Sequence, residues 1–315
     1  MLHLGTMDGY ICLMIYLEKF SLPTQEGESN CFSSSSPTYY TSLYPFQVFP
    51  GKGLTSVEFS DITIFCGSNG SGKSTLLNVI CEKLGLRRDS AFNRTELYDR
   101  YVRKTDARMR YLDPVKNREL MDVSRIITSD DVFNHILDVR ERNSRIDFRR
   151  EVLLQQRREQ SGRPTGIDFS DPESLRMFSR SCDFNRLSAS ELVRRHADAN
   201  ERTYSNGENG YRYFTDAIHP GGLYLLDEPE NSLSVQLQME LAEYLAGMAR
   251  FYDCQFIISS HSPFMLAIPF AKVYDMDSYP VSVRRWTEIP SVLAYHDFFK
   301  VHEDEFRQPG PISFE

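Results

Sequence analysis

One stretch of the chain, residues 62–80, restricts the possible fold more than any other part of the sequence. It reads ITIFCGSNGSGKSTLLNVI, which is an apolar β-prone run, a turn of Gly and Ser, and a helical run. Within it, Gly67 to Ser74 fits G-x-x-x-x-G-K-[ST], the pattern of a phosphate-binding loop between a strand and a helix. Glycines suit this loop because the backbone must approach a phosphate closely and adopt angles that a Cβ forbids. The stretch therefore predicts an α/β fold with a nucleoside triphosphate site.

The residues of this loop have separate predicted roles. Backbone amides from Asn69 onward converge on an anion at the positive end of the following helix. Lys73 adds a point charge for the β- and γ-phosphates, and Ser74 supplies a hydroxyl for Mg²⁺. The predicted nucleotide-binding residues are Asn69, Gly70, Ser71, Gly72, Lys73, Ser74 and Thr75.

Two later apolar runs end in residues that would complete such a site. A predicted buried strand over residues 223–226 is followed by Asp227 and Glu228, and a second over 255–259 leads to His261. Functional groups gather at the carboxyl ends of neighbouring parallel strands, so these side chains are expected to lie together. Asp227 is predicted to hold Mg²⁺ through its water shell, and Glu228 to orient and deprotonate an attacking water. The predicted catalytic residues are Lys73, Glu228 and His261, and the predicted metal ligands are Ser74 and Asp227.

Three segments carry a family resemblance: GSNGSGKST (67–75), LYLLDEPE (223–230) and FIISSHSP (256–263). They resemble the P-loop, Walker B and switch-histidine segments of ABC-type ATPases. They are more similar to the soluble branch, with its RecF- and SMC-like heads and small bacterial AAA-family ATPases, than to transporter subunits. The resemblance covers most of residues 14–100 and 200–300. It implies a P-loop NTPase fold, an ABC ATPase head with a mixed sheet, and Mg²⁺-dependent hydrolysis of ATP to ADP and phosphate.

The same resemblance implies a second phosphate site and a dimer. Residues 205–208, SNGE, stand where this family has its signature, usually LSGGQ, which serves the nucleotide of the opposite subunit, so that two heads clamp two ATP molecules. The implied residues in trans are Ser205, Gly207 and Glu208. The chain departs from the family pattern in three ways: the signature is degenerate, Ser234 replaces the expected D-loop aspartate, and no obvious Q-loop glutamine follows the P-loop helix. Ser129 and Asp130 are the candidates for that position, with Ser129 as a plain helix cap as the alternative.

The remaining patterns divide the chain into parts. A discontinuous nucleotide-binding core is predicted over 14–86 and 204–300, with an inserted helical, Arg-rich lobe over 87–203 and extensions at 1–13 and 301–315. No heptad pattern persists for many turns, so the lobe is expected to be compact rather than a long arm. Strands are predicted at 14–22, 44–49, 54–59 and 61–66, helices at 74–84, 96–104, 147–160 and 234–251, a strand–turn–helix unit at 124–137, and two last strands within 271–286.

Some assignments keep two interpretations. Tyr44 and Phe46 are candidates for stacking on adenine, with core packing as the alternative. The whole chain carries a net charge of −8, yet residues 87–163 hold 19 Lys and Arg against 14 Asp and Glu. Nearly all of these cations are Arg, which suits bidentate phosphate or carboxylate contacts, so this region is either a nucleic-acid surface or a solvated helical face.

The composition excludes several classes of protein. The six cysteines form no C-x-x-C pair, which favours reduced structural thiols in a cytoplasmic protein. No run approaches the length of a membrane helix, so no membrane association is expected. Residues 1–13 read as a dispensable extension before Met14 or as an artefact of the chosen start codon.

The leading functional hypothesis is an ATP-driven dimeric switch that acts on a partner effector, on nucleic acid, or on both. By resemblance, small bacterial ATPases of this kind accompany nucleases or toxins in phage-defence operons of the Septu and retron types. The chain has no evident nuclease motif, so a damaging activity would come from another protein. The alternatives are the nucleotide-binding subunit of an ABC transporter and a RecF-like DNA-repair ATPase.

Overall fold

The computed structural model describes residues 14–32, 43–95, 97–160 and 205–307, together with the single residues 173 and 176. The chain divides into two units. One, the core unit, comprises residues 1–132 and 206–315, and the other comprises residues 133–205.

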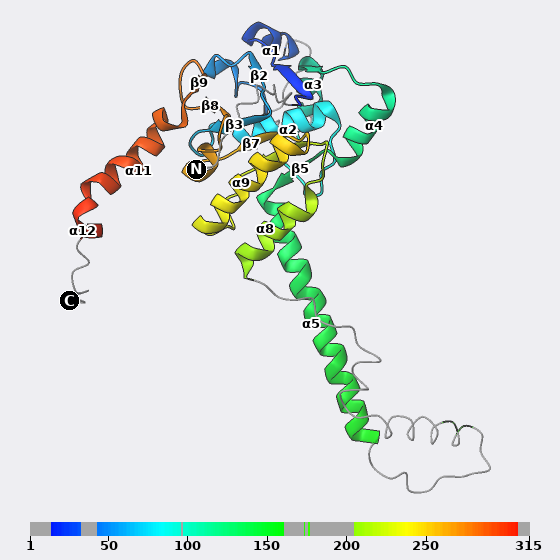
Figure 1. The fold of residues 1–315 in the computed structure, drawn as a ribbon. Coiled ribbons are helices and arrows are strands. Elements are labelled where there is room, and N and C mark those ends of the chain that lie inside the picture. Colours follow the sequence, from blue (N-terminus) through cyan, green and yellow to red (C-terminus); the bar gives the residue numbers. More distant parts are fainter. Residues whose placement is uncertain are drawn as a thin grey trace, which may run out of the picture. The chain divides into compact units, whose positions relative to one another are not determined.

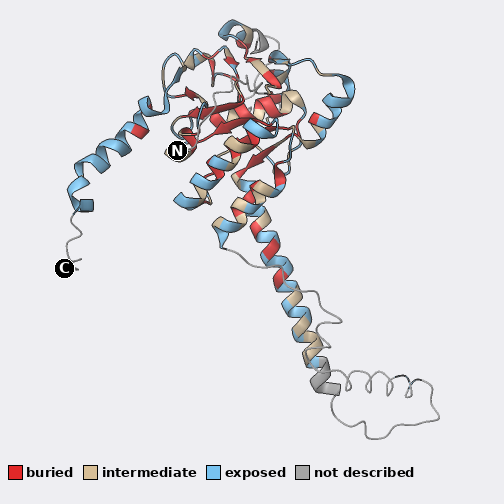
Figure 2. Cartoon of the chain, viewed as in Figure 1, coloured by how far each residue is buried: buried red, intermediate tan, exposed pale blue. Residues whose placement is uncertain are grey.

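A six-stranded sheet forms the centre of the core unit, in the order β5-β6-β7-β3-β8-β9 (Figure 1). Its five parallel strands are β5 (Arg125–Thr128), β6 (Leu223–Asp227), β7 (Gln255–Ser259), β3 (Ile62–Cys66) and β8 (Lys272–Asp275). The edge strand β9 (Ser282–Arg284) pairs antiparallel with β8. Every residue of β3 and β7 is buried (Figure 2), as expected for central parallel strands covered on both faces. The predicted fold, an α/β P-loop architecture with a mixed sheet, is confirmed.

A smaller antiparallel sheet packs beside the first one. It has the order β2-β1-β4, formed by β2 (Ser56–Glu58), β1 (Leu17–Ser21) and β4 (Asp106–Met109). The fully buried Gln255 at the start of β7 joins the two sheets. Its Oε1 accepts from the amides of Tyr16 and Leu17 at 2.9 and 2.8 Å, and its Nε2 donates to the carbonyls of Leu17 and Ser60, both at 2.9 Å.

The helices of the core unit begin and end where the sequence signals stand. For example, Ser234 caps α9 by accepting from the Leu237 amide, and Gly85 ends α2 in the left-handed conformation. The helices of this unit that the structure describes are α1 (Gln25–Phe32), α2 (Lys73–Leu84), α3 (Tyr98–Lys104), α4 (Pro114–Val123), α8 (Asn206–Ala217), α9 (Val235–Phe251), α10 (Pro263–Leu266), α11 (Pro290–Val301) and α12 (Glu303–Arg307).

Helix α5 (Ser129–Gln160) begins in the core unit and continues into the second unit. Its 32 residues correspond to about 48 Å of α-helix. The helix predicted at 147–160 lies within it. The prediction of a compact lobe concerns mainly residues 161–204. Almost all of these lie outside the described residues, so the prediction is not tested.

Three predictions about local structure need correction. The inserted unit begins at residue 133 rather than 87, because β4 pairs with β1 and β5 with β6, so residues 87–132 belong to the core unit. Residues 44–49 form turns instead of a strand, since Pro45 and Pro50 lack the N–H that a strand ladder uses. Helix α5 is capped by Thr128, not Ser129: the Thr128 Oγ1 accepts from the Asp131 amide, and the Asp131 carboxylate accepts from the Thr128 amide.

Two expectations from composition can be compared with the described residues. Cys66, Cys81 and Cys254 are free and buried, as expected of structural thiols, and burial raises the pKa of the Cys66 thiol to about 11. The other three cysteine side chains lie outside the described part. Among the described helices, none is long and apolar enough to cross a membrane.

Candidate nucleotide site

The three predicted motifs meet at one edge of the main sheet. Strand β7 lies between β6 and β3, with Asp227 opposite Ser259 and Phe65 opposite Ser259 in the paired registers. The loop after β3, the turn after β6 and the loop after β7 are therefore neighbours. This is the arrangement that the carboxyl ends of parallel strands produce.

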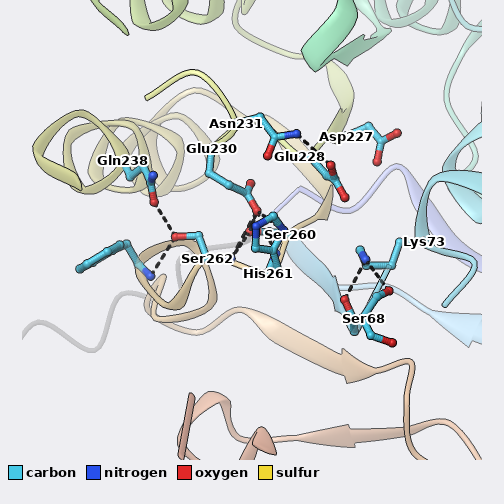
Figure 3. Close-up of polar contacts among 12 residues, drawn as sticks. Ser68, Lys73, Asp227, Glu228, Glu230, Asn231, Gln238, Ser260, His261 and Ser262 are labelled. Atoms are coloured by element: carbon cyan, nitrogen blue, oxygen red, sulfur yellow. Dashed lines mark hydrogen bonds and ion pairs between the residues drawn. The ribbon is translucent and has the colours of Figure 1, made fainter. Parts of the chain in front are cut away.

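The P-loop, residues 67–72, wraps the start of α2. Gly70 and Gly72 have φ of 79° and 95°, in the left-handed region that favours glycine. Lys73 is almost completely buried, and its Nζ donates to the carbonyls of Gly67 at 2.8 Å and Ser68 at 3.1 Å (Figure 3). The ammonium group is thus held inside the loop at the point where the sequence predicts phosphate.

Ser74 and Asp227 come together although 153 residues separate them. The Ser74 Oγ donates to Asp227 Oδ1 at 3.0 Å, and this bond joins the start of α2 to the end of β6. Desolvation by burial raises the pKa of the Asp227 carboxyl. Hydrogen bonds from neighbouring hydroxyls, including that of Ser74, oppose this increase in the pKa. Both groups are oxygen ligands, as Mg²⁺ requires. The described residues hold no cluster of three or more His, Cys, Asp or Glu side chains able to bind a metal ion. This donor set fits Mg²⁺, which proteins commonly hold through one or two side chains, waters and substrate phosphates.

A cavity of about 520 Å³ opens beside this pair. Ser74, Thr75 and Asp227 line one part of it, and Ser129 and Asp130 at the start of α5 line another. Both candidates for the missing Q-loop residue therefore lie at the same cavity as the predicted metal ligands.

The turn after β6 holds Glu228 and the loop after β7 holds His261. Glu228 has a φ of 49°, unusual for a residue with a side chain, and its amide donates to the Ser259 carbonyl at 2.9 Å. Its Oε2 accepts from Asn231 Nδ2 at 2.9 Å. The His261 Nδ1 lies 3.2 Å from Glu230 Oε1, and half of the His261 side chain is exposed.

Comparison with known proteins identifies the family. A family model described as ABC transporter matches residues 55–231, which is more than half of the chain. The chain belongs to this family of ABC ATPase domains. A second model, described as an AAA domain and assigned to AbiEii toxins of type IV TA systems, matches residues 213–267. No curated protein matches significantly.

Solved structures of low sequence identity are also similar to this ABC ATPase chain. One is the Smc head domain of Pyrococcus furiosus with an extended coiled coil, bound to the C-terminal domain of ScpA: 14% identity, 93% of this chain, 100% of that chain, TM-score 0.40. Another is a dimeric post-hydrolysis state of the ATP-binding cassette MJ0796 bound to ADP and Pi. It is 12% identical, the match covers 73% of this chain and 88% of that chain, and the TM-score is 0.35. A third is an inward-facing metal-chelate type ABC transporter. It is 16% identical, the match covers 76% of this chain and 80% of that chain, and the TM-score is 0.34.

The predicted signature residues of the ABC chain lie at the start of α8. Ser205 directly precedes this helix, and Gly207 and Glu208 are in its first turn. A Cβ on Gly207 would lie 3.1 Å from Leu237 Cδ1 and 3.4 Å from the Ser232 carbonyl oxygen, so Gly207 packs closely against the segment that joins β6 to α9. The predicted signature residue Gly207 and the predicted D-loop position, Ser234, are therefore adjacent in one chain.

The two candidates for adenine stacking differ in position. Phe46 is buried in the core, with its ring edge-on to Tyr101 at 5.0 Å between centroids. Tyr44 lines the cavity, and its hydroxyl donates to Thr75 Oγ1 at 3.2 Å. Of the two, Tyr44 is the aromatic that borders the cavity.

Sequence reasoning missed three side chains that hold this ABC site. Asp277, after β8, accepts from the Ser68 amide at 2.6 Å and from its hydroxyl at 2.9 Å, and so fixes the P-loop. Asn231 fixes Glu228, and Glu230 contacts the loop of His261. Glu230 lies in the LYLLDEPE segment that carried the resemblance and Asn231 directly follows it, so their proximity to Glu228 was the available signal. Nothing in the sequence around Asp277 pointed to the P-loop.

Proposed function

We propose that this ABC ATPase chain hydrolyses ATP at this site and works as an ATP-gated switch for a separate partner. The observation that carries the proposal is the 3.0 Å bond between Ser74 Oγ and Asp227 Oδ1, which brings the P-loop and Walker B residues together. Bound Mg²⁺ would neutralise charge on the phosphates and would be held by these two side chains.

The other residues have roles that follow from their geometry. Lys73 and the amides of the P-loop bind the phosphate oxygens and neutralise the charge that develops on them. Glu228, fixed by Asn231, orients water in line with the γ-phosphate and accepts its proton at the carboxylate. His261 reaches the γ-phosphate from the neighbouring strand end. Ser129 or Asp130 takes the Q-loop position, which the shared cavity supports.

The switch requires a second copy of the chain. We infer that Ser205, Gly207 and Glu208 contact the nucleotide of the opposite subunit, so that two ATP molecules lie between two core units. The packing of Gly207 against the segment after β6 supports this, since it couples the signature to the Walker B turn of the same chain.

The partner is proposed to be an effector protein, such as a nuclease or toxin, in a defence system. The match of residues 213–267 of this chain to a model described as an AAA domain of AbiEii toxin, type IV TA system, supports a link to a toxin–antitoxin type of system. Several arginines of residues 87–163 form ion pairs with carboxylates of the chain, among them Arg94 with Asp99 and Arg108 with Glu18. This internal pairing leaves less positive charge for nucleic acid and favours a protein partner.

The variant Glu228→Gln tests the enzymatic part. It keeps the shape of the side chain and the acceptor for Asn231, but it removes the carboxylate that takes the proton. We expect MgATP binding by calorimetry to be retained, phosphate release to fall by about 10²-fold or more, and a dimer to accumulate in ATP during size-exclusion chromatography with light scattering. The matched control is Glu243→Gln, an exposed carboxylate on α9. Retained steady-state hydrolysis in Glu228→Gln would refute the assignment.

The trapped variant also tests the switch. Tagged Glu228→Gln protein is purified from its own host in ATP and Mg²⁺, and the proteins and nucleic acids that accompany it are identified. A nuclease, a toxin or a defined nucleic acid retained in ATP but not in ADP supports the switch. Integral membrane proteins would overturn it and favour the transport subunit, the alternative that the description of the family model suggests.

A further inference from the structure

Glu230 lies beside the proposed catalytic residues and has no role in the motifs described above. It follows Asp227 by three residues, and only 5% of its surface is exposed. A buried carboxylate is unfavourable unless hydrogen-bond donors compensate for the lost water. The donors around Glu230 therefore indicate what this side chain does.

Within the described part of the chain, the donors to Glu230 come from the loop after β7. Glu230 Oε1 accepts from Ser260 Oγ at 2.8 Å, from the His261 amide at 2.8 Å and from the Ser262 amide at 3.3 Å. The same oxygen lies 3.2 Å from the His261 Nδ1 (Figure 3). One carboxylate oxygen thus fixes both the backbone and the ring of His261.

The loop has a second attachment that limits its movement. Ser262 Oγ donates to Gln238 Oε1 on α9 at 2.7 Å, and Gln238 Nε2 donates to the Leu233 carbonyl at 3.0 Å. The position of the histidine is therefore defined by the turn after β6 on one side and by α9 on the other.

The ring contact has a chemical consequence. A neutral imidazole has one N–H donor and one acceptor nitrogen, whereas an ionised carboxylate only accepts. An Nδ1 lone pair 3.2 Å from an ionised carboxylate oxygen would be repelled, so this contact favours the proton on Nδ1 and leaves Nε2 as the nitrogen for a ligand. Half of the His261 side chain is exposed, so the ring is only partly covered by its surroundings.

We propose that Glu230 is a positioning residue that acts through His261, holding the proton on Nδ1 and presenting Nε2 toward the γ-phosphate. When the ring takes a second proton at Nε2, that N–H donates to a phosphate oxygen, and the carboxylate balances the positive charge. The kinetic part of this inference rests on the proposed ATPase function, but the position of the proton does not.

The tautomer is measured first, in protein without nucleotide. Long-range ¹⁵N–¹H correlation spectra of ¹⁵N-histidine-labelled protein distinguish a ring protonated at Nδ1 from one protonated at Nε2, and His261→Asn assigns the signal. We expect the Nδ1–H form in wild type, a loss of that preference in Glu230→Leu, which has no acceptor oxygen, and no change in the control Glu243→Leu. A wild-type ring protonated at Nε2, or an unchanged spectrum in Glu230→Leu, would overturn the proposal. If Glu230→Leu does not fold, the wild-type spectrum alone still decides.

A double-mutant cycle then tests whether Glu230 acts through the histidine. We expect Glu230→Gln to lower kcat at least tenfold while KM for ATP changes less than threefold. In a His261→Ala background, the same substitution should change kcat less than twofold, because the residue it positions is absent. Equal losses in both backgrounds would show a role independent of His261 and contradict the proposal. An inactive wild type would instead refute the ATPase function, and the spectra would still report on the proton.

Discussion

Gly72, the last residue of the P-loop, allows a prediction whose size can be derived from the structure. Its φ is 95°, and a Cβ added there would lie 2.9 Å from Val48 Cγ1 and 3.4 Å from Phe49 Cε1. Gly70, two residues earlier, has a similar φ of 79°, yet a Cβ there would meet nothing within 4 Å. Alanine at the two positions therefore shares the backbone cost and differs in the clash.

The two terms have separate magnitudes. A residue with a side chain in the left-handed region costs roughly 1–2 kcal/mol, and both variants gain a similar amount, about 0.4–1 kcal/mol, from a less flexible unfolded chain. Forcing extra volume into packed surroundings costs roughly 1–3 kcal/mol. We therefore expect Gly72→Ala to lower the free energy of unfolding by about 1–3 kcal/mol more than Gly70→Ala does.

The assay is urea denaturation of nucleotide-free protein, followed by circular dichroism, for both single variants and for Val48→Ala with and without Gly72→Ala. Truncating Val48 removes the group that clashes, so the double mutant should be more stable than the sum of the single effects predicts, by about the same 1–3 kcal/mol. Equal destabilisation by the two glycine substitutions, together with additive behaviour of the pair, would refute the reasoning.

Two further predictions concern binding and pH. Lys73→Ala removes the ammonium group from the P-loop. Because a hydrogen bond to a charged group contributes roughly 1.5–3 kcal/mol, calorimetry should show that the affinity for MgATP is about 10- to 100-fold lower. An unchanged affinity would contradict the assigned role. Burial raises the pKa of Tyr16 and of Tyr224 to about 12, whereas an unfolded tyrosine titrates near 10. Because the folded pKa is the higher one, the stabilising effect is fully present below pH ~10 and is lost as the pH rises toward 12. Other tyrosines of the chain contribute to the same absorbance, so the signals of Tyr16 and Tyr224 are obtained as differences between wild type and the variants Tyr16→Phe and Tyr224→Phe. These differences should appear together with the loss of circular dichroism, and ionisation of the two residues well before loss of structure would contradict the prediction.

The sequence predicted the parts of the fold that depend on local pattern. The apolar runs before Gly67, Asp227 and Ser260 are strands, and the predicted amphipathic helix at 234–251 is α9, with Ser234 as its cap. Such features depend on neighbouring residues only. The parallel arrangement then brings the strand ends together without further information.

The errors arose where distant residues decide the structure. Strand β4 exists because Asp106 to Met109 pairs with β1, about ninety residues earlier, and no periodicity within so short and half-exposed a strand shows that. The contact of Asp277 with Ser68 joins residues 209 positions apart. The apolar run at 44–49 looked like a strand because Phe46 and Phe49 are core residues, but a turn between two prolines buries them equally well.

The turn after β6 explains why so much of the candidate site is concentrated in five residues. In a continuing strand, successive side chains would point to opposite faces, so Asp227 and Glu228 could not serve one site. The left-handed conformation of Glu228 ends the strand at that point. Asp227 then meets Ser74, Glu228 meets Asn231, and Glu230 reaches the loop of His261. A residue with a side chain pays a conformational cost at such a φ, and glycine would avoid it. The presence of glutamate where glycine would be less strained therefore supports a chemical role for its carboxylate rather than a role in stability.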